Sequence, residues 1–249
     1  MKTLIATILI LLTTFSAYSQ DSLLIRANQQ YAEGKYEQAI DLYQQILKSN
    51  MESAEVYYNL GNAFYKTGQY TRSIINYERA KLLAPNDDDI DFNLEIANQH
   101  VVDAITPLPK VFFIRWWHNL INKFSADGWA KISLFSFVLT LILAGFFFFT
   151  TSGSIKRSSF WTGIFVLAIS ILSYNFAARQ EKMMTEHRFA IITQSSVTVK
   201  SSPSEGGTNL FLIHEGLKVE ILDQLGTWNN IRLADGNQGW LPDNSMEKI

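Results

Sequence analysis

Apolar residues in the first third of the chain recur at helical spacing, and the pattern repeats after 34 residues. Residues 21–51 match residues 55–85 when the chain is shifted by this period. The matched positions include Asn28 and Asn62, Tyr31 and Tyr65, Gly34 and Gly68, Tyr36 and Tyr70, and Tyr43 and Tyr77. Two copies that agree in phase predict two pairs of helices, over residues 20–53 and 54–87.

Two glycines interrupt the helical pattern of the second copy. Gly61 stands inside a predicted helix, where a glycine costs about 1 kcal/mol relative to alanine. We expect Gly61 to lie where the paired helices cross, because a side chain there would hold them apart; Ala27 is its counterpart in the first copy. Gly68, like Gly34, is expected to end the first helix of its pair in the left-handed conformation.

Residues 54–87 resemble the tetratricopeptide repeat family. The resemblance rests on Tyr57-x-x-Leu60-Gly61-x-x-Phe64, on Ser73-x-x-x-Tyr77, and on Ala80 and Pro85. The copy at 20–53 is looser, with Met51 in place of the proline. Two repeats cannot bury their last apolar face alone. We therefore expect a capping helix within 87–105, with acidic residues at its start and Leu94, Ala97 and Val101 at helical spacing.

This resemblance implies a concave groove lined by the first helix of each pair, and hence protein partners. By analogy with the family, the groove residues are Asn28, Tyr58, Asn59, Asn62, Tyr65 and Lys66. An asparagine offers both a donor and an acceptor to the backbone of an extended peptide. The alternative is that these asparagines only satisfy local backbone groups. Leu24 stands at a position that is basic in members that grip a terminal carboxylate, which argues against that ligand.

Two uncharged apolar runs, Ile132 to Thr151 and Phe160 to Ala178, are long enough to span a bilayer as helices. The short intervening segment SGSIKRSS predicts a two-helix transmembrane hairpin, with buried core helices as the alternative. Ahead of the first run, residues 107–130 mix apolar residues with Arg115 and Lys123 and with the tryptophans Trp116, Trp117 and Trp129. This mixture favours an amphipathic segment at the membrane interface; the alternative is a linker packed on a soluble domain.

The first 19 residues have the layout of a secretory signal peptide. Lys2 precedes an apolar run from Leu4 to Phe15, and Ala17 and Ser19 are small, so we expect cleavage after Ser19. Export would place the hairpin loop in the cytoplasm and both terminal domains in the periplasm, at the inner membrane of a bacterium. Basic residues flank both ends of the hairpin, so charge bias alone does not set this orientation.

The C-terminal residues 187–249 change to a period of two with turn residues between short segments. Strands are predicted at Val197–Val199 and after Glu215-Gly216, with a hairpin about Asp235-Gly236. With Gly239-Trp240-Leu241-Pro242, these features resemble a bacterial SH3-type barrel over residues 189–247. Trp228 and Trp240 are interpreted either as barrel core, which we favour, or as a ligand surface.

Composition and motifs argue against several functions. The net charge of −2 does not favour nucleic-acid binding, and the lack of cysteine excludes disulfides and thiolate chemistry. The chain has no HExxH, GxSxG, P-loop or dinucleotide fingerprint, and its four histidines lie in different segments. We therefore expect no catalytic residue, no metal site and no cofactor.

The order of all-α tetratricopeptide repeats, a transmembrane hairpin and a small all-β SH3-like barrel resembles the BatE family of the Bacteroides aerotolerance operon. That resemblance implies a non-enzymatic membrane scaffold in an aerotolerance or oxidative-stress complex. Its implied partners are other Bat operon products, including von Willebrand A-domain membrane proteins. One alternative is an anchor whose barrel binds peptidoglycan. Another is a cytoplasmic assembly factor, which would follow from an uncleaved start.

Overall fold

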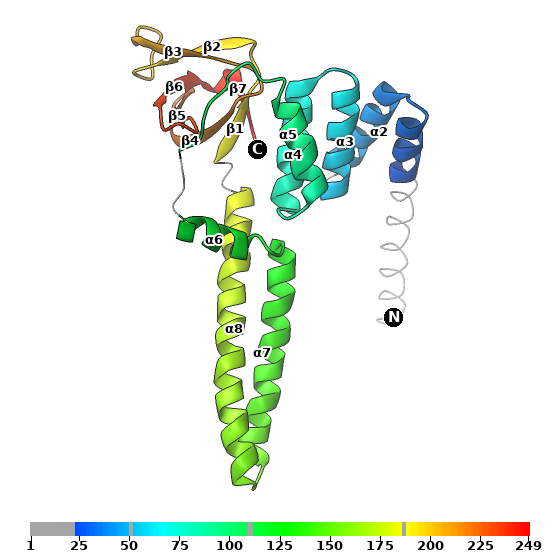
Figure 1. Cartoon of the computed structure of the whole chain (residues 1–249), viewed down its shortest axis with the longest axis vertical. Coiled ribbons are helices and arrows are strands. Elements are labelled where there is room, and N and C mark those ends of the chain that lie inside the picture. The colour runs from blue at the N-terminus through cyan, green and yellow to red at the C-terminus, as the bar shows by residue number, and fades with distance from the viewer. Residues whose placement is uncertain (1–22, 50–51, 109–111, 186–187) are drawn as a thin grey trace, which may run out of the picture. The chain divides into compact units, whose positions relative to one another are not determined.

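The computed structural model of the chain describes residues 23–49, 52–108, 112–185 and 188–249 (Figure 1). The predicted signal peptide, residues 1–19, lies outside the described residues. The chain forms two compact units. One unit combines the helical repeats with the C-terminal residues Arg188–Ile249, and the other contains Pro109–His187.

The repeats are antiparallel helices packed in series (Figure 1). They are a helix described over residues 23–32, α2 (Tyr36–Lys48), α3 (Ala54–Lys66), α4 (Tyr70–Leu83) and α5 (Asp88–Asn98). Ser53 begins α3 by accepting a hydrogen bond from the Val56 amide at 3.2 Å, and Asp87 begins α5 by accepting from the Asp89 amide at 3.0 Å. These caps satisfy amides that have no partner within the helix.

The roles predicted for the glycines are confirmed. A Cβ atom on Gly61 would lie 2.7 Å from two ring carbons of Tyr77, so α3 and α4 cross with no room for a side chain. Gly34 and Gly68 have φ angles of 77° and 76°. The amide of Gln69, which follows Gly68, donates to the Phe64 carbonyl at 2.9 Å, which closes the helix end.

The C-terminal residues form one antiparallel sheet of seven strands in the order β3-β2-β6-β5-β4-β1-β7. The strands are β1 (Phe189–Ile192), β2 (Ser196–Lys200), β3 (Asn209–His214), β4 (Lys218–Leu225), β5 (Trp228–Arg232), β6 (Gln238–Pro242) and β7 (Met246–Lys248), with a 3-10 turn at Asp243–Ser245 before β7. The predicted hairpin about Asp235-Gly236 is confirmed, since β5 pairs with β6 around it. Val199, Ile213, Ile231 and Leu241 fill the core of the sheet.

The repeats and the C-terminal sheet share a hydrophobic core, although residues 109–187 separate them in the chain. Ile191 and Ile249 of the sheet pack in one cluster with Ile74 of α4 and Leu94 and Ala97 of α5. The face that two repeats leave open is therefore covered by α5 and the sheet together.

Ion pairs surround this shared core. Arg79 contacts Glu247 at 2.8 Å, and the nearly buried carboxylate of Glu78 contacts Lys218 at 2.5 Å. After α5, Asp103 accepts from the backbone amide of His214 at 2.6 Å. Each contact joins a residue of the helical segment to a residue of the sheet, so the two segments form one body.

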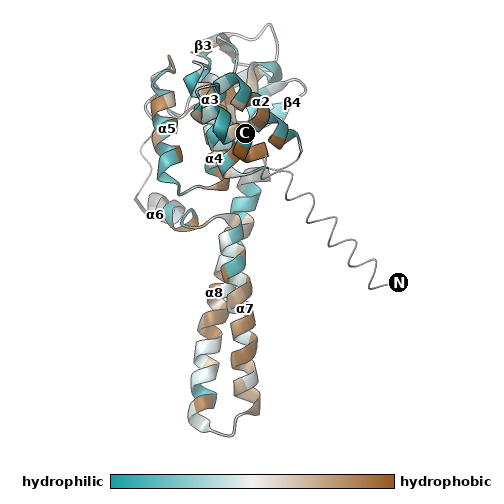
Figure 2. Cartoon of the chain, turned by 90° about the vertical axis from the view of Figure 1, so that its right-hand side faces the viewer, coloured by the Kyte–Doolittle hydropathy of each residue, from teal (hydrophilic) through white to brown (hydrophobic). Residues whose placement is uncertain are grey.

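The second unit consists of α6 (Phe112–Ile121), α7 (Ala126–Phe149) and α8 (Gly153–Thr185). α7 and α8 are long and apolar enough to span a membrane by length and composition, and only 6% and 22% of their most apolar windows are buried. Figure 2 shows the middle of both helices mostly in brown and white. Ser133 and Ser170 tie the two helices together, since each hydroxyl donates to the other residue's carbonyl at 3.0 Å.

Two details of this unit differ from expectation. The segment SGSIKRSS was expected to be a loop, but α8 already begins at Gly153 and only Thr150–Ser152 connect the helices. Serine, lysine and arginine are compatible with a helix, so the composition of this segment did not reveal where α8 begins. Trp129 was grouped with the interfacial residues, but it lies in α7, is 8% exposed, and donates to the Ile121 carbonyl at 2.6 Å.

α6 leaves an apolar face uncovered within its own unit. Phe112, Phe113 and Trp116 are mostly exposed. Gln180 of α8 holds the end of this helix by donating to the carbonyls of Ile121 and Phe124, both at 2.9 Å. The exposed aromatic face fits the predicted amphipathic segment, which stays a prediction.

Candidate functional site

A ladder of hydrogen-bonded asparagines runs across the first helices of the repeats. The Asn28 Oδ1 atom accepts from the Tyr43 hydroxyl at 2.6 Å and from Asn59 Nδ2 at 3.3 Å. The same arrangement recurs one period later. There, Asn62 Oδ1 accepts from the Tyr77 hydroxyl at 2.7 Å and from Asn93 Nδ2 at 3.0 Å. We call Asn28, Asn59, Asn62 and Asn93 the asparagine ladder.

Each ladder bond uses one end of a carboxamide and leaves the other end free. Asn28 and Asn62 are bonded through their oxygens, and their Nδ2 groups donate to no described residue. Asn59 and Asn93 are bonded through their Nδ2 groups, and their Oδ1 atoms accept from no residue in the described segments. The ladder therefore carries both spare donors and spare acceptors.

The ladder borders a cavity of about 420 Å³ on the repeats. Its lining consists of Tyr31, Tyr58, Asn62, Tyr65, Lys66, Tyr77, Asn93 and Ile96. Four of the six predicted groove residues are in this lining, while Asn28 and Asn59 stand in the ladder without lining the cavity. Among the described residues that line this cavity, Lys66 is the one cation.

Sequence reasoning missed the contributions of α5 and of the second helices. Asn93 and Ile96 come from α5, which we had expected only to cap the repeats. Asn93 lies 34 residues after Asn59, so the period itself could have identified it. Tyr43 and Tyr77 were recognised as matched positions, but their bonds to asparagines 15 residues away depend on how the helices pack.

Burial extends the pH range over which the ladder tyrosines stay protonated. It raises the pKa of Tyr43 to about 12, and it raises the pKa of Tyr77 still further above the usual tyrosine value. Both side chains are almost fully buried, at 1% and 2% exposure. Their hydroxyls donate to the asparagine oxygens, and this contact turns the spare Nδ2 groups away from the tyrosines.

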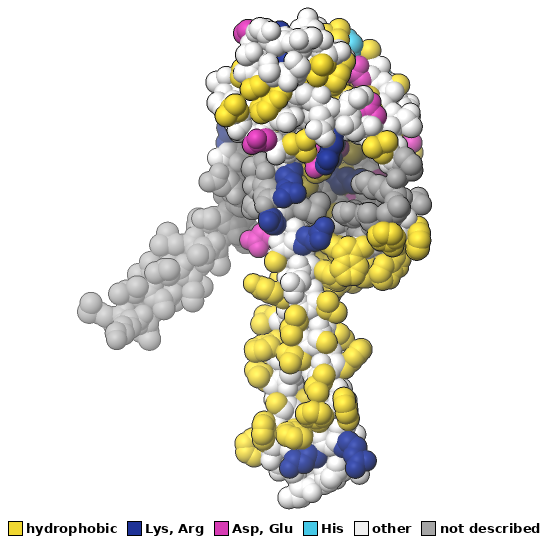
Figure 3. Space-filling view, turned by 90° about the vertical axis from the view of Figure 1, so that its left-hand side faces the viewer, with side chains coloured by type: hydrophobic (Ala, Val, Ile, Leu, Met, Phe, Trp, Pro, Cys, Tyr) yellow, Lys and Arg dark blue, Asp and Glu magenta, His cyan; other side chains and the backbone are white. Residues whose placement is uncertain are grey.

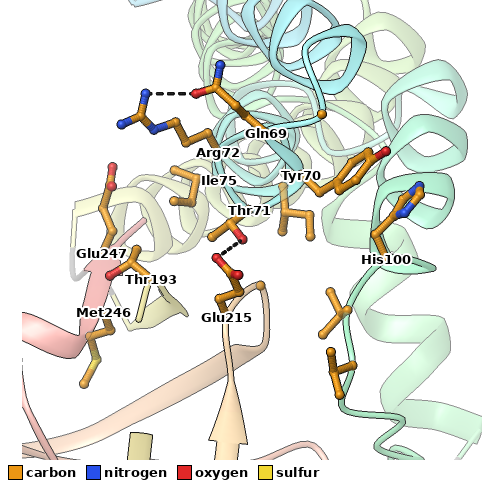
Figure 4. Close-up of a pocket in the computed structure, with 15 residues that line it drawn as sticks. Gln69, Tyr70, Thr71, Arg72, Ile75, His100, Thr193, Glu215, Met246 and Glu247 are labelled. Carbon is orange, nitrogen blue, oxygen red and sulfur yellow. Dashed lines mark hydrogen bonds between the residues drawn. The ribbon is translucent and has the colours of Figure 1, made fainter. Parts of the chain in front are cut away.

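A larger cavity, of about 650 Å³, lies between α4 and the C-terminal sheet (Figure 4). Its charged groups have both signs, and most already have partners. Glu215 accepts from the Thr71 hydroxyl at 3.2 Å, and Glu247 pairs with Arg79. His100 stacks on Tyr70 with a centroid distance of 3.6 Å. This cavity does not concentrate one kind of charge and so favours no single class of ligand.

Trp228 and Trp240 of the C-terminal sheet lie outside its hydrophobic core, so the interpretation of them as core residues, which we had favoured, is wrong. Trp228 and Trp240 are half-buried and alternate along β5 and β6 with the buried residues Ile231 and Leu241. Alternate side chains of a strand point to opposite faces. The pair therefore lies on the outer face, where Asn230 is paired with Trp240 in the strand register.

Comparison with protein families matches the helical segment. The family model described as TPR repeat matches residues 27–68, and the model described as tetratricopeptide repeat matches residues 54–87. Residues 27–87 contain tetratricopeptide repeats. These matches agree with the observed helix pairs and with the 34-residue period, and repeats of this kind are modules of protein–protein interaction. No curated protein matches the chain.

The described side chains offer no evident centre for metal chemistry. Within 23–49, 52–108, 112–185 and 188–249, no group of three or more histidine, aspartate or glutamate residues is placed to hold an ion. The residues that line the groove cavity offer carboxamide, phenol and lysine side chains.

Proposed function

We propose that the chain is a membrane-anchored scaffold that binds an extended segment of a protein partner in the groove of its tetratricopeptide repeats. The observation that carries this proposal is the pair of identical ladder units, each with an unused carboxamide donor and an unused acceptor. An extended backbone presents carbonyl and amide groups in alternation, so it can satisfy both kinds of group.

The lining of the groove suggests which segment would bind. Tyr31, Tyr58 and Tyr65 offer flat surfaces with polar edges, and Ile96 adds an aliphatic contact. Lys66 is exposed at the same cavity and favours an acidic group on the partner. The preferred segment is therefore extended, carries an apolar or aromatic side chain, and has an acidic residue near the Lys66 end.

Anchoring through α7 and α8 is the second part of the proposal. Several polar side chains along the hairpin are bonded within it. For example, the Thr140 hydroxyl donates to the Ser136 carbonyl at 2.9 Å and Asn175 donates to the Ile171 carbonyl at 2.7 Å. Such self-satisfaction is what a lipid environment requires. The location at a bacterial inner membrane, with periplasmic terminal domains and Bat operon partners, rests on the export signal and on the family resemblance.

Site-specific photocrosslinking in intact cells tests the groove. A photoreactive amino acid replaces Lys66 in the groove and, as the control position, Lys48 on α2. Asn62→Asp keeps the oxygen that accepts from Tyr77 but replaces the spare donor by an anionic oxygen. Gln45→Glu makes the same chemical change on an exposed site of α2.

We expect a discrete protein product from position 66 and none from position 48. Asn62→Asp should reduce that product about tenfold, the effect of a lost hydrogen bond plus an uncompensated charge, while Gln45→Glu should not change it. A product that is insensitive to Asn62→Asp would show that the ladder does not bind the partner. Protease access to both terminal domains in spheroplasts tests the orientation separately.

A second candidate function is binding of peptidoglycan by the C-terminal sheet. The half-buried position of Trp228 and Trp240 on its outer face supports this candidate. It predicts that the full chain sediments with purified cell wall and that Trp240→Ala abolishes sedimentation while leaving the Lys66 crosslink intact.

A further inference from the structure

The turn of the helical hairpin combines basic and aromatic side chains in one cleft. This cleft, of about 380 Å³, is lined by Phe147 at the end of α7 and by Gly153, Lys156, Arg157 and Phe160 at the start of α8. The rings of Phe147 and Phe160 have centroids 5.7 Å apart, and the Lys156 ammonium lies 5.4 Å from the Phe147 centroid. The cleft thus has aromatic walls and two cations.

Nothing nearby in the chain neutralises these two cations. The sequence contains no aspartate or glutamate between Asp127 and Glu181. Lys156 and Arg157 are exposed, and in the part of the chain that the structure describes neither one pairs with a carboxylate. In Figure 3 basic side chains gather at the tip of the hairpin, directly beyond a surface of hydrophobic side chains. The two exposed cations are therefore available to an anion that binds at the tip of the hairpin.

We propose that this cleft, which we call the tip cleft, binds the phosphate of an anionic phospholipid. The proposal rests on the membrane-spanning role proposed above for α7 and α8. A hairpin that crosses the bilayer places its turn at the depth of the headgroups, where Lys156 and Arg157 can contact a phosphate. Phe147 and Phe160 then contact the glycerol and the first methylene groups of the lipid. A zwitterionic headgroup is less favourable because its own cation opposes the two basic side chains.

Native mass spectrometry of the full chain in non-ionic detergent tests the tip cleft. The probe is an equimolar mixture of phosphatidylglycerol and phosphatidylcholine with identical acyl chains, and the readout is the ratio of the two bound lipids. The test variant is Lys156→Gln with Arg157→Gln. The matched control is Lys131→Gln with Arg179→Gln, which removes the same charge from the other end of the hairpin. All four side chains are exposed or partly exposed, so the fold is retained.

We expect the unmodified chain to prefer phosphatidylglycerol by about tenfold, from two cations near a phosphate. The tip variant should lose this preference and the control should keep it. An unchanged ratio in the tip variant, or an equal loss in both variants, would overturn the proposal. Complete displacement of the lipid by excess inorganic phosphate would instead assign the cleft to a free anion and would also overturn it.

The proposal that α7 and α8 anchor the chain in the membrane has a separate test. Extraction of the chain from cell membranes by alkaline carbonate would refute the anchor, and the tip cleft with it. A chain that stays in the membrane with an unchanged lipid ratio would refute only the tip cleft. The Asn62→Asp variant should leave the lipid ratio unaltered, which separates the lipid site from the groove.

Discussion

The shared core of repeats and C-terminal sheet leads to a prediction about how instability spreads through the chain. Leu94 of α5 is 6% exposed and packs in the cluster that contains Ile191 and Ile249 of the sheet. Leu60 lies one period earlier, is 2% exposed, and packs only with residues of the repeats. Leu94→Ala and Leu60→Ala are therefore the same change at equivalent positions with different neighbours.

The size of the effect follows from the groups removed. A buried leucine that becomes alanine loses about 2.4 kcal/mol of transfer free energy from three methylene-sized groups, and the cavity left behind raises the loss to about 3 kcal/mol. Because the cluster takes its members from both segments, we assign about half of the Leu94 loss, roughly 1.5 kcal/mol, to contact with the sheet. That share corresponds to an approximately tenfold change in an opening equilibrium.

Hydrogen exchange of the full chain in detergent measures this directly. Leu94→Ala should speed the exchange of amides in α5 and, by about tenfold, in β1. Leu60→Ala should speed exchange in α2 and α3 and leave β1 unchanged. If Leu94→Ala accelerates exchange in α5 alone, the sheet does not depend on its packing against α5, and the argument that α5 and the sheet open together is wrong.

Three further predictions concern the repeats. Gly61→Ala should lower the free energy of unfolding by about 1 kcal/mol, since crowding against Tyr77 outweighs the helix propensity gained. Urea denaturation measures this change. A more stable variant would disprove the close crossing of α3 and α4 at Gly61. Ser53→Ala should lower the free energy of unfolding by about 1 kcal/mol, because it removes the acceptor for the Val56 amide. The same assay measures this change, and an unchanged stability would mean that water replaces the cap. Because burial raises the pKa of Tyr43 from 10.0 to about 12, its stabilising effect is complete below pH 10 and is lost as the pH rises toward 12. Denaturation between pH 9 and 12 should show a loss of up to about 1.4 kcal/mol per pH unit from this group, and Tyr43→Phe should flatten the profile; an unaltered slope would contradict the assignment.

Much of the local architecture could be predicted from the sequence because it depends on near neighbours. The 34-residue period identified the helix pairs, and the left-handed glycine at 68 and the crossing glycine at 61 follow from that period. The hairpin about Asp235-Gly236 and the two long apolar runs are likewise local patterns. In each case the residues that decide the structure lie within one element or one turn of each other.

The tertiary structure decided the features that join distant segments. It selects which end of the Asn28 and Asn62 carboxamides is free, because Tyr43 and Tyr77 reach these two asparagines only after the helices pack. It also buries Trp129 beneath α6 and joins Leu94 to Ile191 across residues 109–187. Hydrogen-bond direction and shared burial depend on contacts between residues far apart in the chain. The local spacing of apolar and polar residues does not predict such contacts.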